Sequence, residues 1–188
     1  VNFSRSPGRY YLEENFSKLV ALSAGTLYST NTDFEALGTN CSADDITFSA
    51  TRAGLQLQTD GATNDQVIIL PHLTSGITGW TNVKWGTENQ VVWECAISTA
   101  ASITDCLFWA GLKLTNTSAI ATDADQVFFR FSQGTDTYWV VESSIGNSDT
   151  ATPSTIAPAV NSIYRFKIVI DSSRKAHCYI NGTHIYTT

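Results

Sequence analysis

The sequence predicts an all-β protein with the antiparallel β-sandwich fold of a jelly roll. Segments with strand-like alternation recur with turn signals about every 8–12 residues, a spacing typical of sandwiches and jelly rolls. No long segment shows a convincing helical period. The C-terminal residues 164–186 form hairpins that can be assigned residue by residue. Together these observations favour about a dozen short strands packed as two sheets.

The C-terminal stretch gives the clearest strands. Residues 164–170 alternate apolar and polar side chains, the period of a strand with one buried face. Polar residues 171–174 form a turn, and residues 175–180 form a second strand. Asn181-Gly182 then predicts a tight type I′ hairpin turn, which needs a positive φ at both central positions. The register of this turn opposes Tyr179 to His184.

Continued without interruption, that register opposes Cys178 to Ile185 and His177 to Tyr186. It divides the last hairpin into two faces. One face is expected to carry Cys178, Ile180 and Ile185, and the other His177, Tyr179, His184 and Tyr186.

The remaining elements are assigned along the chain. Residues 1–22 form an N-terminal arm and first element, of which 10–22 fit either a helix or a strand, and residues 23–40 are mostly irregular. A single sandwich domain covers residues 23–188. Residues 143–161 are rich in Ser and Thr and predict a surface loop. Strands are expected at 46–48, 54–59, 66–70, 83–85, 90–97, 105–114, 125–131 and 137–142.

Composition restricts the classes of partner. The 188 residues are 43% hydrophobic and 15% charged, which suits one globular domain. The formal net charge of −6 disfavours nucleic acid as a partner, because phosphate backbones are repelled. No apolar run approaches a membrane span, so no membrane partner is predicted. The chain begins with Val1, contains no methionine and ends just after a strand, which suggests a processed or truncated chain.

Four cysteines leave two readings open. Cys41, Cys95, Cys106 and Cys178 show no CxxC or close Cys/His spacing, so a structural zinc site has little support. Cys95 and Cys106 flank a short Ser/Thr/Ala-rich link and could form a disulfide between neighbouring strands. Free cysteines acting as small buried apolar side chains are the alternative.

Three segments resemble a known family. Glu14-Asn-Phe16 is similar to an opening acidic-x-Phe strand, and residues 54–66 resemble a Gly-x-x-Leu-x-Thr…Asp-Gln segment. Residues 164–182 resemble a Tyr-x-x-x-Ile-x-Ile-Asp…Tyr-Ile-Asn-Gly hairpin. The resemblance is to concanavalin A-like lectin/glucanase and laminin-G-like sandwiches, especially those in virion proteins of phages and large viruses. That family includes lectins, glycosidases, lyases, adhesion modules and capsid proteins, so the fold does not settle function.

The residue patterns argue against an enzyme. Retaining glycosidases need two carboxylates about 5–5.5 Å apart, and the family places them on one strand as Glu-x-Asp-x-x-Glu or Glu-x-Asp-x-Glu. Here Glu94 stands alone and Glu142 is expected to be isolated at a strand end. The Gln-x-His pair of alginate-lyase-like members is also missing. The acidic pairs Asp44-Asp45 and Asp123-Ala-Asp125 are better explained as loop caps than as calcium ligands.

Aromatic residues supply the candidate binding positions, for a sugar or for a neighbouring subunit. Trp109 and Trp139 are either core residues or the lining of a sugar groove. No metal site is predicted, because the two histidines of the last hairpin have no third ligand in sight. The candidate binding residues are His177, Tyr179, His184, Tyr186, Trp109 and Trp139.

The expected function is that of a non-enzymatic virion surface protein without a cofactor. A capsid decoration subunit is favoured, with a tail or fibre component as a close second, located on the virion surface. Other virion proteins and sister subunits, with a trimer favoured, are the expected partners. The alternative is a carbohydrate-binding module or adhesin for a cell-surface glycan. An open groove with exposed aromatics would favour this alternative, whereas apolar patches suited to neighbours would favour the structural role.

Overall fold

The structure is a computed structural model that describes residues 12–16, 34–49, 54–61, 64–71, 87–115 and 117–188. The chain forms two compact units, residues 1–84 and 85–188. The predicted division after residue 22 stays a prediction, because the residues on both sides of it lie outside the described ranges. The predicted strand at 83–85 also lies outside them, as does most of the ambiguous segment 10–22.

In the first unit, four short strands form two antiparallel pairs, β1 with β4 and β2 with β3. The predicted strand at 46–48 is found with unchanged ends, and those at 54–59 and 66–70 are found with ends shifted by one or two residues. Their bounds are β1 (Phe34–Leu37), β2 (Ile46–Phe48), β3 (Leu55–Leu57) and β4 (Ile68–Pro71), and a short 3-10 helix, η1 (Ala43–Asp45), precedes β2.

One strand of this unit is not predicted from the sequence. Residues 23–40 are expected to be mostly irregular, but residues 34–37 form β1, and residues 23–33 lie outside the described ranges. The hydrogen bonds of this strand come from β4, more than 30 residues further along the chain by its register, in which Leu37 pairs with Ile68. A four-residue strand is too short to show a period, so only its partner identifies it.

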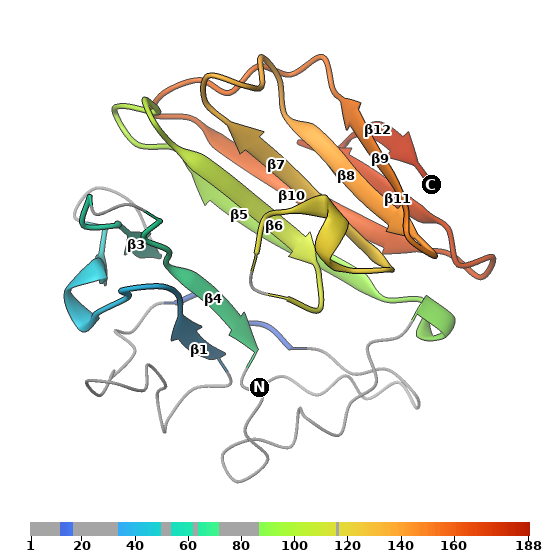
Figure 1. The fold of residues 1–188 in the computed structure, drawn as a ribbon, viewed down its shortest axis with the longest axis horizontal. Helices are drawn as coiled ribbons and strands as arrows, with labels where there is room; N and C mark the ends of the chain where they lie inside the picture. Colours follow the sequence, from blue (N-terminus) through green and yellow to red (C-terminus); the bar gives the residue numbers. More distant parts are fainter. Residues whose placement is uncertain (1–11, 17–33, 50–53, 62–63, 72–86, 116) are drawn as a thin grey trace, which may run out of the picture. The chain divides into compact units, whose positions relative to one another are not determined.

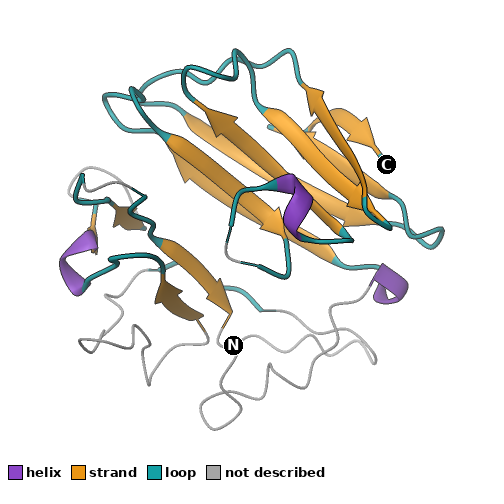
Figure 2. Ribbon diagram, in the orientation of Figure 1, coloured by secondary structure: helices purple, strands orange, loops and turns teal. Residues whose placement is uncertain are grey.

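The second unit contains two antiparallel sheets of four strands, ordered β12-β11-β10-β5 and β6-β7-β8-β9. Figure 1 shows them as two layers of this unit, and Figure 2 shows that strands dominate it. The strands are β5 (Val92–Ser98), β6 (Leu107–Leu112), β7 (Gln126–Ser132), β8 (Val140–Ile145), β9 (Ser148–Pro153), β10 (Ile163–Ile170), β11 (Ala176–Ile180) and β12 (Thr183–Thr187). The 3-10 helices η3 (Thr87–Asn89) and η4 (Ile120–Thr122) complete the unit.

This arrangement confirms the predicted all-β antiparallel sandwich. The described residues contain 3-10 helices but no α-helix. Within that part of the chain, no helix has the length and apolar character needed to cross a membrane.

An aromatic layer holds the two sheets together. Trp139, which is 1% exposed, lies just before β8 and its ring centroid is 4.8 Å from that of Phe166 on β10. Phe129 on β7 contacts the same Phe166 ring at 4.7 Å, and Tyr164 contacts Trp139 at 5.2 Å. Tilted and edge-on contacts of this kind each add about 0.5–1.5 kcal/mol beyond the burial of area. Trp139 is therefore a core residue and cannot line a sugar groove.

The predicted alternation of β10 is confirmed. Tyr164, Phe166, Ile168 and Ile170 are buried, and the residues between them are exposed or half-buried. The turn at Asn181-Gly182 has the predicted positive φ angles, 51° and 82°. The backbone N–H of Asn181 also donates to the carbonyl of Arg165 at 2.8 Å, which ties this turn to β10.

The predicted register of the last hairpin is wrong beyond its first two pairs. Tyr179 pairs with His184 as expected, but a β-bulge at Cys178/Tyr179 then pairs Cys178 with Tyr186 and His177 with Thr187. An extra residue on one strand shifts the alternation of the rest of that strand. Tyr186 therefore leaves the predicted aromatic face and packs half-buried against the core, as does Ile185.

The predicted surface loop at residues 143–161 is also wrong in its first half. Residues 143–145 complete β8, and residues 148–153 form β9, which pairs with β8 along six positions. Gly146 and Asn147 connect them with φ angles of 56° and 66°. Gly-Asn is a recognised two-residue hairpin signal, and Thr favours strands, so the sequence did contain the evidence.

All four cysteines are free, so the structure does not form the Cys95–Cys106 disulfide. Cys95 lies on β5 and Cys106 just before β6, and these strands belong to different sheets. Burial raises the pKa of Cys178 to about 12 and raises the pKa of Cys95 as well. Both therefore stay protonated and behave as small apolar side chains, Cys178 fully buried and Cys95 half-buried.

Prediction for the core. Ile168 on β10 is fully buried, so Ile168→Ala is expected to lower the free energy of unfolding by about 2–5 kcal/mol. Ile163→Ala on the same strand is the matched control: this side chain is 51% exposed, and a change of less than about 0.5 kcal/mol is expected. Urea titrations of both variants measure the two values. Equal effects of the two substitutions would show that the assigned faces of β10 are wrong.

Candidate functional site

Each sheet of the second unit has one face on the core and one outer face. On the sheet β12-β11-β10-β5, the outer face carries three of the six predicted binding residues. We name the surface formed by these three residues the histidine face. His177 and Tyr179 come from β11, and His184 comes from β12. The ring of His184 lies 5.3 Å from that of Tyr179 and 6.2 Å from that of His177. The structure thus brings these three residues together.

A line of hydrogen-bonding groups runs through the histidine face. Nε2 of His177 lies 2.8 Å from Oδ2 of Asp171, in the turn between β10 and β11. Nδ1 of His177 lies 3.1 Å from the hydroxyl oxygen of Thr187, and Nε2 of His184 lies 2.8 Å from the same oxygen. The contact with His177 and the backbone N–H groups of Lys175 and Ser173 lower the pKa of Asp171. Sequence reasoning found the two histidines but missed Asp171 and Thr187. The bulge places Thr187 beside His177, whereas Asp171 comes from the turn between β10 and β11.

The rest of this outer face is a mixture of apolar and charged side chains. Val92 on β5 is 54% exposed, and Ile163 at the start of β10 is 51% exposed. Lys167 and Glu94 form an ion pair of 2.6 Å, with both side chains open to solvent. Exposed pairs of this kind contribute at most about 1 kcal/mol. Glu94, expected to stand alone, is therefore a surface partner of Lys167.

Trp109 lies on the outer face of the other sheet. It is half-buried on β6, opposes Arg130 of β7, and its ring meets Phe128 edge-on at 6.4 Å. Of the six predicted binding residues, the structure therefore places three on the histidine face and one on the opposite outer face. The other two, Tyr186 and Trp139, contribute to the core.

A charged cluster surrounds Arg130, and sequence reasoning missed it. The guanidinium group donates from Nε and Nη2 to the two oxygens of Asp136, at 3.2 and 3.0 Å. Its Nη1 pairs with Oε1 of Glu142 on the neighbouring strand β8. Asp136 is held in turn by the backbone N–H of Ser132, at 2.7 Å. Arg130 thus bridges two carboxylates, and we name Arg130, Asp136 and Glu142 together the Arg130 fork.

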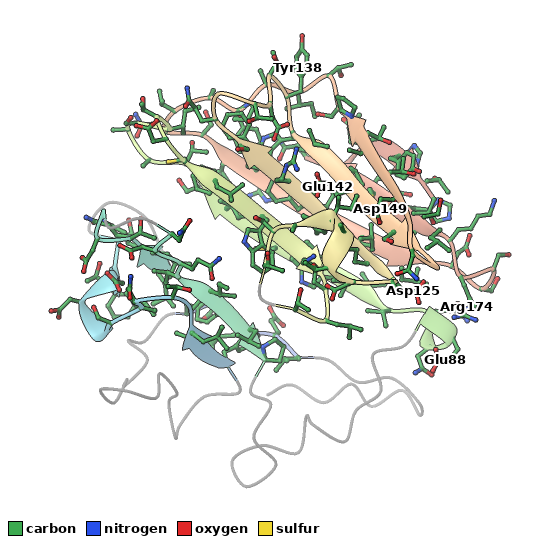
Figure 3. All side chains as sticks on the ribbon, viewed as in Figure 1. Glu88, Asp125, Tyr138, Glu142, Asp149 and Arg174 are labelled. Atoms are coloured by element: carbon green, nitrogen blue, oxygen red, sulfur yellow. The ribbon has the colours of Figure 1, made fainter. Side chains whose placement is uncertain are left out.

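The prediction that Glu142 is isolated at a strand end is wrong. It lies within β8, as Figure 3 shows, it opposes Phe128 of β7, and its side chain is 1% exposed. Burial raises the pKa of Glu142, although the charge of Arg130 acts against this effect. Its Oε1 pairs with Arg130, while its buried Oε2 has no hydrogen-bond partner among the described residues.

A second buried ion pair joins Lys113, which follows β6, to Asp123, which follows η4. Nζ of Lys113 is 3.4 Å from Oδ2 of Asp123 and 4.4 Å from the centre of the Phe128 ring, and it also bonds to Gln126. Burial alone would raise the pKa of Asp123, but hydrogen bonds from Thr115 and the charge of Lys113 together lower it.

The acidic pairs considered as calcium ligands act as caps. Asp123 accepts hydrogen bonds from the backbone N–H groups of Leu114 and Thr115, both at 3.3 Å. Asp125 accepts from Gly146 at 3.0 Å, and Asp45 accepts from Ser42 at 2.6 Å. No group of three or more His, Cys, Asp or Glu residues converges on a metal position in the described part of the chain.

Comparison with known proteins adds information on the fold. No protein-family model matches the sequence, and no curated protein matches it. Among solved structures, the chain is similar to SO2946, a protein of unknown function from Shewanella oneidensis MR-1, with a TM-score of 0.54 and 12% identity. The similarity covers 83% of this chain and 61% of that one, so this chain spans less than two thirds of that protein. At this identity the likeness shows the fold alone, and the concanavalin A-like resemblance stays a prediction.

Prediction for the Arg130 fork. Arg130→Met leaves Glu142 buried without its cation and is expected to cost about 3–5 kcal/mol of unfolding free energy at pH 7. Removing the positive charge raises the folded-state pKa of Glu142 further. The cost is therefore present at neutral pH and shrinks as the pH falls toward about 4, where the carboxyl group is protonated. Denaturant titrations of the variant and the parent chain, compared at each pH, give the difference.

Two further variants act as controls for the Arg130 fork. Arg130→Met with Glu142→Gln removes the buried charge and is expected to recover part of the loss at pH 7. Lys167→Met breaks the exposed pair with Glu94 and is expected to change stability by less than about 1 kcal/mol. A cost for Arg130→Met that does not change with pH would contradict the role assigned to Glu142.

Proposed function

We propose that this protein is a non-enzymatic structural subunit of a virion surface and that it works by contact through the histidine face. The observation that carries the proposal is the composition of this face: three aromatic or imidazole rings, His177, Tyr179 and His184, lie among exposed aliphatic and charged side chains. The resemblance to sandwiches of phage and large-virus particles supports the assignment to a virion.

The composition of the outer face is typical of a protein–protein contact. Tyrosine and other aromatic residues are enriched at the centres of interfaces, whereas charged pairs occupy the rim. Val92 and Ile163 add exposed apolar area. Burying this area against a neighbour stabilises the contact by about 25 cal/mol per Å². The pair of Lys167 with Glu94 supplies charges suited to a rim.

Sister subunits are the first partner that we propose, with a trimer favoured, and other virion proteins are the second. A capsid decoration subunit is favoured over a tail or fibre component. The net charge of −6 makes nucleic acid an unsuitable partner, because both surfaces would be negative. The proposed location is the particle surface.

Prediction for self-association. Light scattering of the purified chain is expected to give a mass above that of the monomer, and Tyr179→Ser is expected to weaken the association at least about tenfold, the loss of roughly 1.4 kcal/mol. Ile145→Ser is the matched control, since Ile145 is 60% exposed at the end of β8. A chain that stays monomeric up to about 1 mM associates more weakly than about −4 kcal/mol. That result would contradict the self-assembly proposal.

A carbohydrate-binding module is the second candidate, and a different observation favours it. On the outer face of β6-β7-β8-β9, Trp109 opposes Arg130, whose guanidinium is fixed by Asp136. An aromatic ring beside oriented polar groups is the combination that holds a sugar, because the ring stacks on it and the polar groups bond its hydroxyls. The contact surface on this reading is the outer face opposite the histidine face.

Prediction for glycans and turnover. If the second candidate is correct, a glycan array binds the chain, Trp109→Ala abolishes the binding, and Tyr138→Ala, an exposed aromatic control, leaves it intact. Under either candidate, no new reducing or unsaturated ends are expected from β-glucans, alginates or host polysaccharides. Turnover that disappears in Glu142→Gln would overturn the non-enzymatic proposal.

A further inference from the structure

Two imidazole nitrogens, on the neighbouring strands β11 and β12, point at one oxygen atom. Nδ1 of His177 and Nε2 of His184 lie 3.1 and 2.8 Å from the hydroxyl oxygen of Thr187. We propose that His177 and His184 form a site for a first-row divalent cation of the zinc or nickel class. The hydroxyl oxygen of Thr187 and water would complete the coordination. Imidazole nitrogen is a preferred ligand for these metals.

Asp171 prepares His177 for this role. Its Oδ2 lies 2.8 Å from Nε2 of His177 and, as a carboxylate, can only accept a hydrogen bond there. The proton of the neutral ring therefore sits on Nε2, which leaves the lone pair on Nδ1, the nitrogen that faces Thr187. Metal-bound histidines commonly donate their other N–H to a carboxylate in this way, which fixes the ring and raises its basicity.

The separation of the two rings fits a metal after a small adjustment. With zinc–nitrogen distances of about 2.0–2.1 Å and a tetrahedral angle, the two ring centroids would be roughly 5 Å apart. They are 6.2 Å apart here, so the rings would need to approach by about 1 Å. His184 is exposed and belongs to the edge strand β12, so this movement meets little resistance from packing.

The site differs from a structural zinc site in the number of its ligands. The sequence alone predicted no metal here for want of a third ligand, and the structure adds only the hydroxyl of Thr187. Two imidazoles leave coordination positions open to water, so binding is expected to be reversible and folding independent of metal. The inference does not depend on the proposed function, because it concerns the isolated chain.

The test is a titration of the reduced full chain with zinc chloride and, separately, nickel chloride, followed by calorimetry and by the imidazole NMR signals. One cation per chain is expected, and two of the three imidazole signals should shift. His177→Ala and His184→Ala should each weaken binding at least tenfold. His72→Ala, which changes the third histidine of the chain, is the matched control and should leave binding unchanged.

A further variant tests the positioning role of Asp171. Asp171→Asn keeps an oxygen to accept from the backbone N–H groups of Ser173 and Lys175 but removes the carboxylate from His177. Zinc affinity is expected to fall by about 10–100-fold, the usual effect of losing such a partner, with the circular dichroism spectrum unchanged. Absence of a calorimetric signal, or binding that survives both histidine variants, would overturn the proposal. So would an equal loss in His72→Ala.

Discussion

The structure of the second unit depends on one contact, the aromatic layer in which Phe166 of β10 meets Phe129 of β7 and Trp139. Two sheets can form a sandwich only if each sheet gathers its apolar side chains on one face, the face that packs against the other sheet. The period-2 alternation of the strands then sends every second side chain outward. Both candidate surfaces are consequences of this constraint, because they consist of the residues that the core leaves out.

The two outer faces use their polar residues in different ways. On β7 and β8 the outward positions hold Arg130 and Glu142, whose charges are largely withdrawn from water and compensate each other. Such a buried pair adds little net stability but is costly to break on one side only. The histidine face is more open, and its polar groups are joined through Thr187. It therefore offers groups that a partner or a cation can still reach.

The bulge between Cys178 and Tyr179 changes which residues of β12 pair with β11. Because of this extra residue, Tyr186 packs toward the core and Thr187 lies beside His177. Without the bulge, the aromatic face would gain a tyrosine and the two histidines would lose the hydroxyl that joins them. One irregular position thus decides the chemistry of the surface.

The sequence by itself determined the all-β class, the buried face of β10 and the hairpin turn at Asn181-Gly182. These features follow from side-chain alternation and from the φ angles that Asn and Gly tolerate, which are local properties. The tertiary structure decided the bulge, the pairing of β1 with β4, and the ion pair of Arg130 with Glu142. Each of these depends on which segments lie side by side and on which side chains the packed sheets bury. No local pattern specifies either.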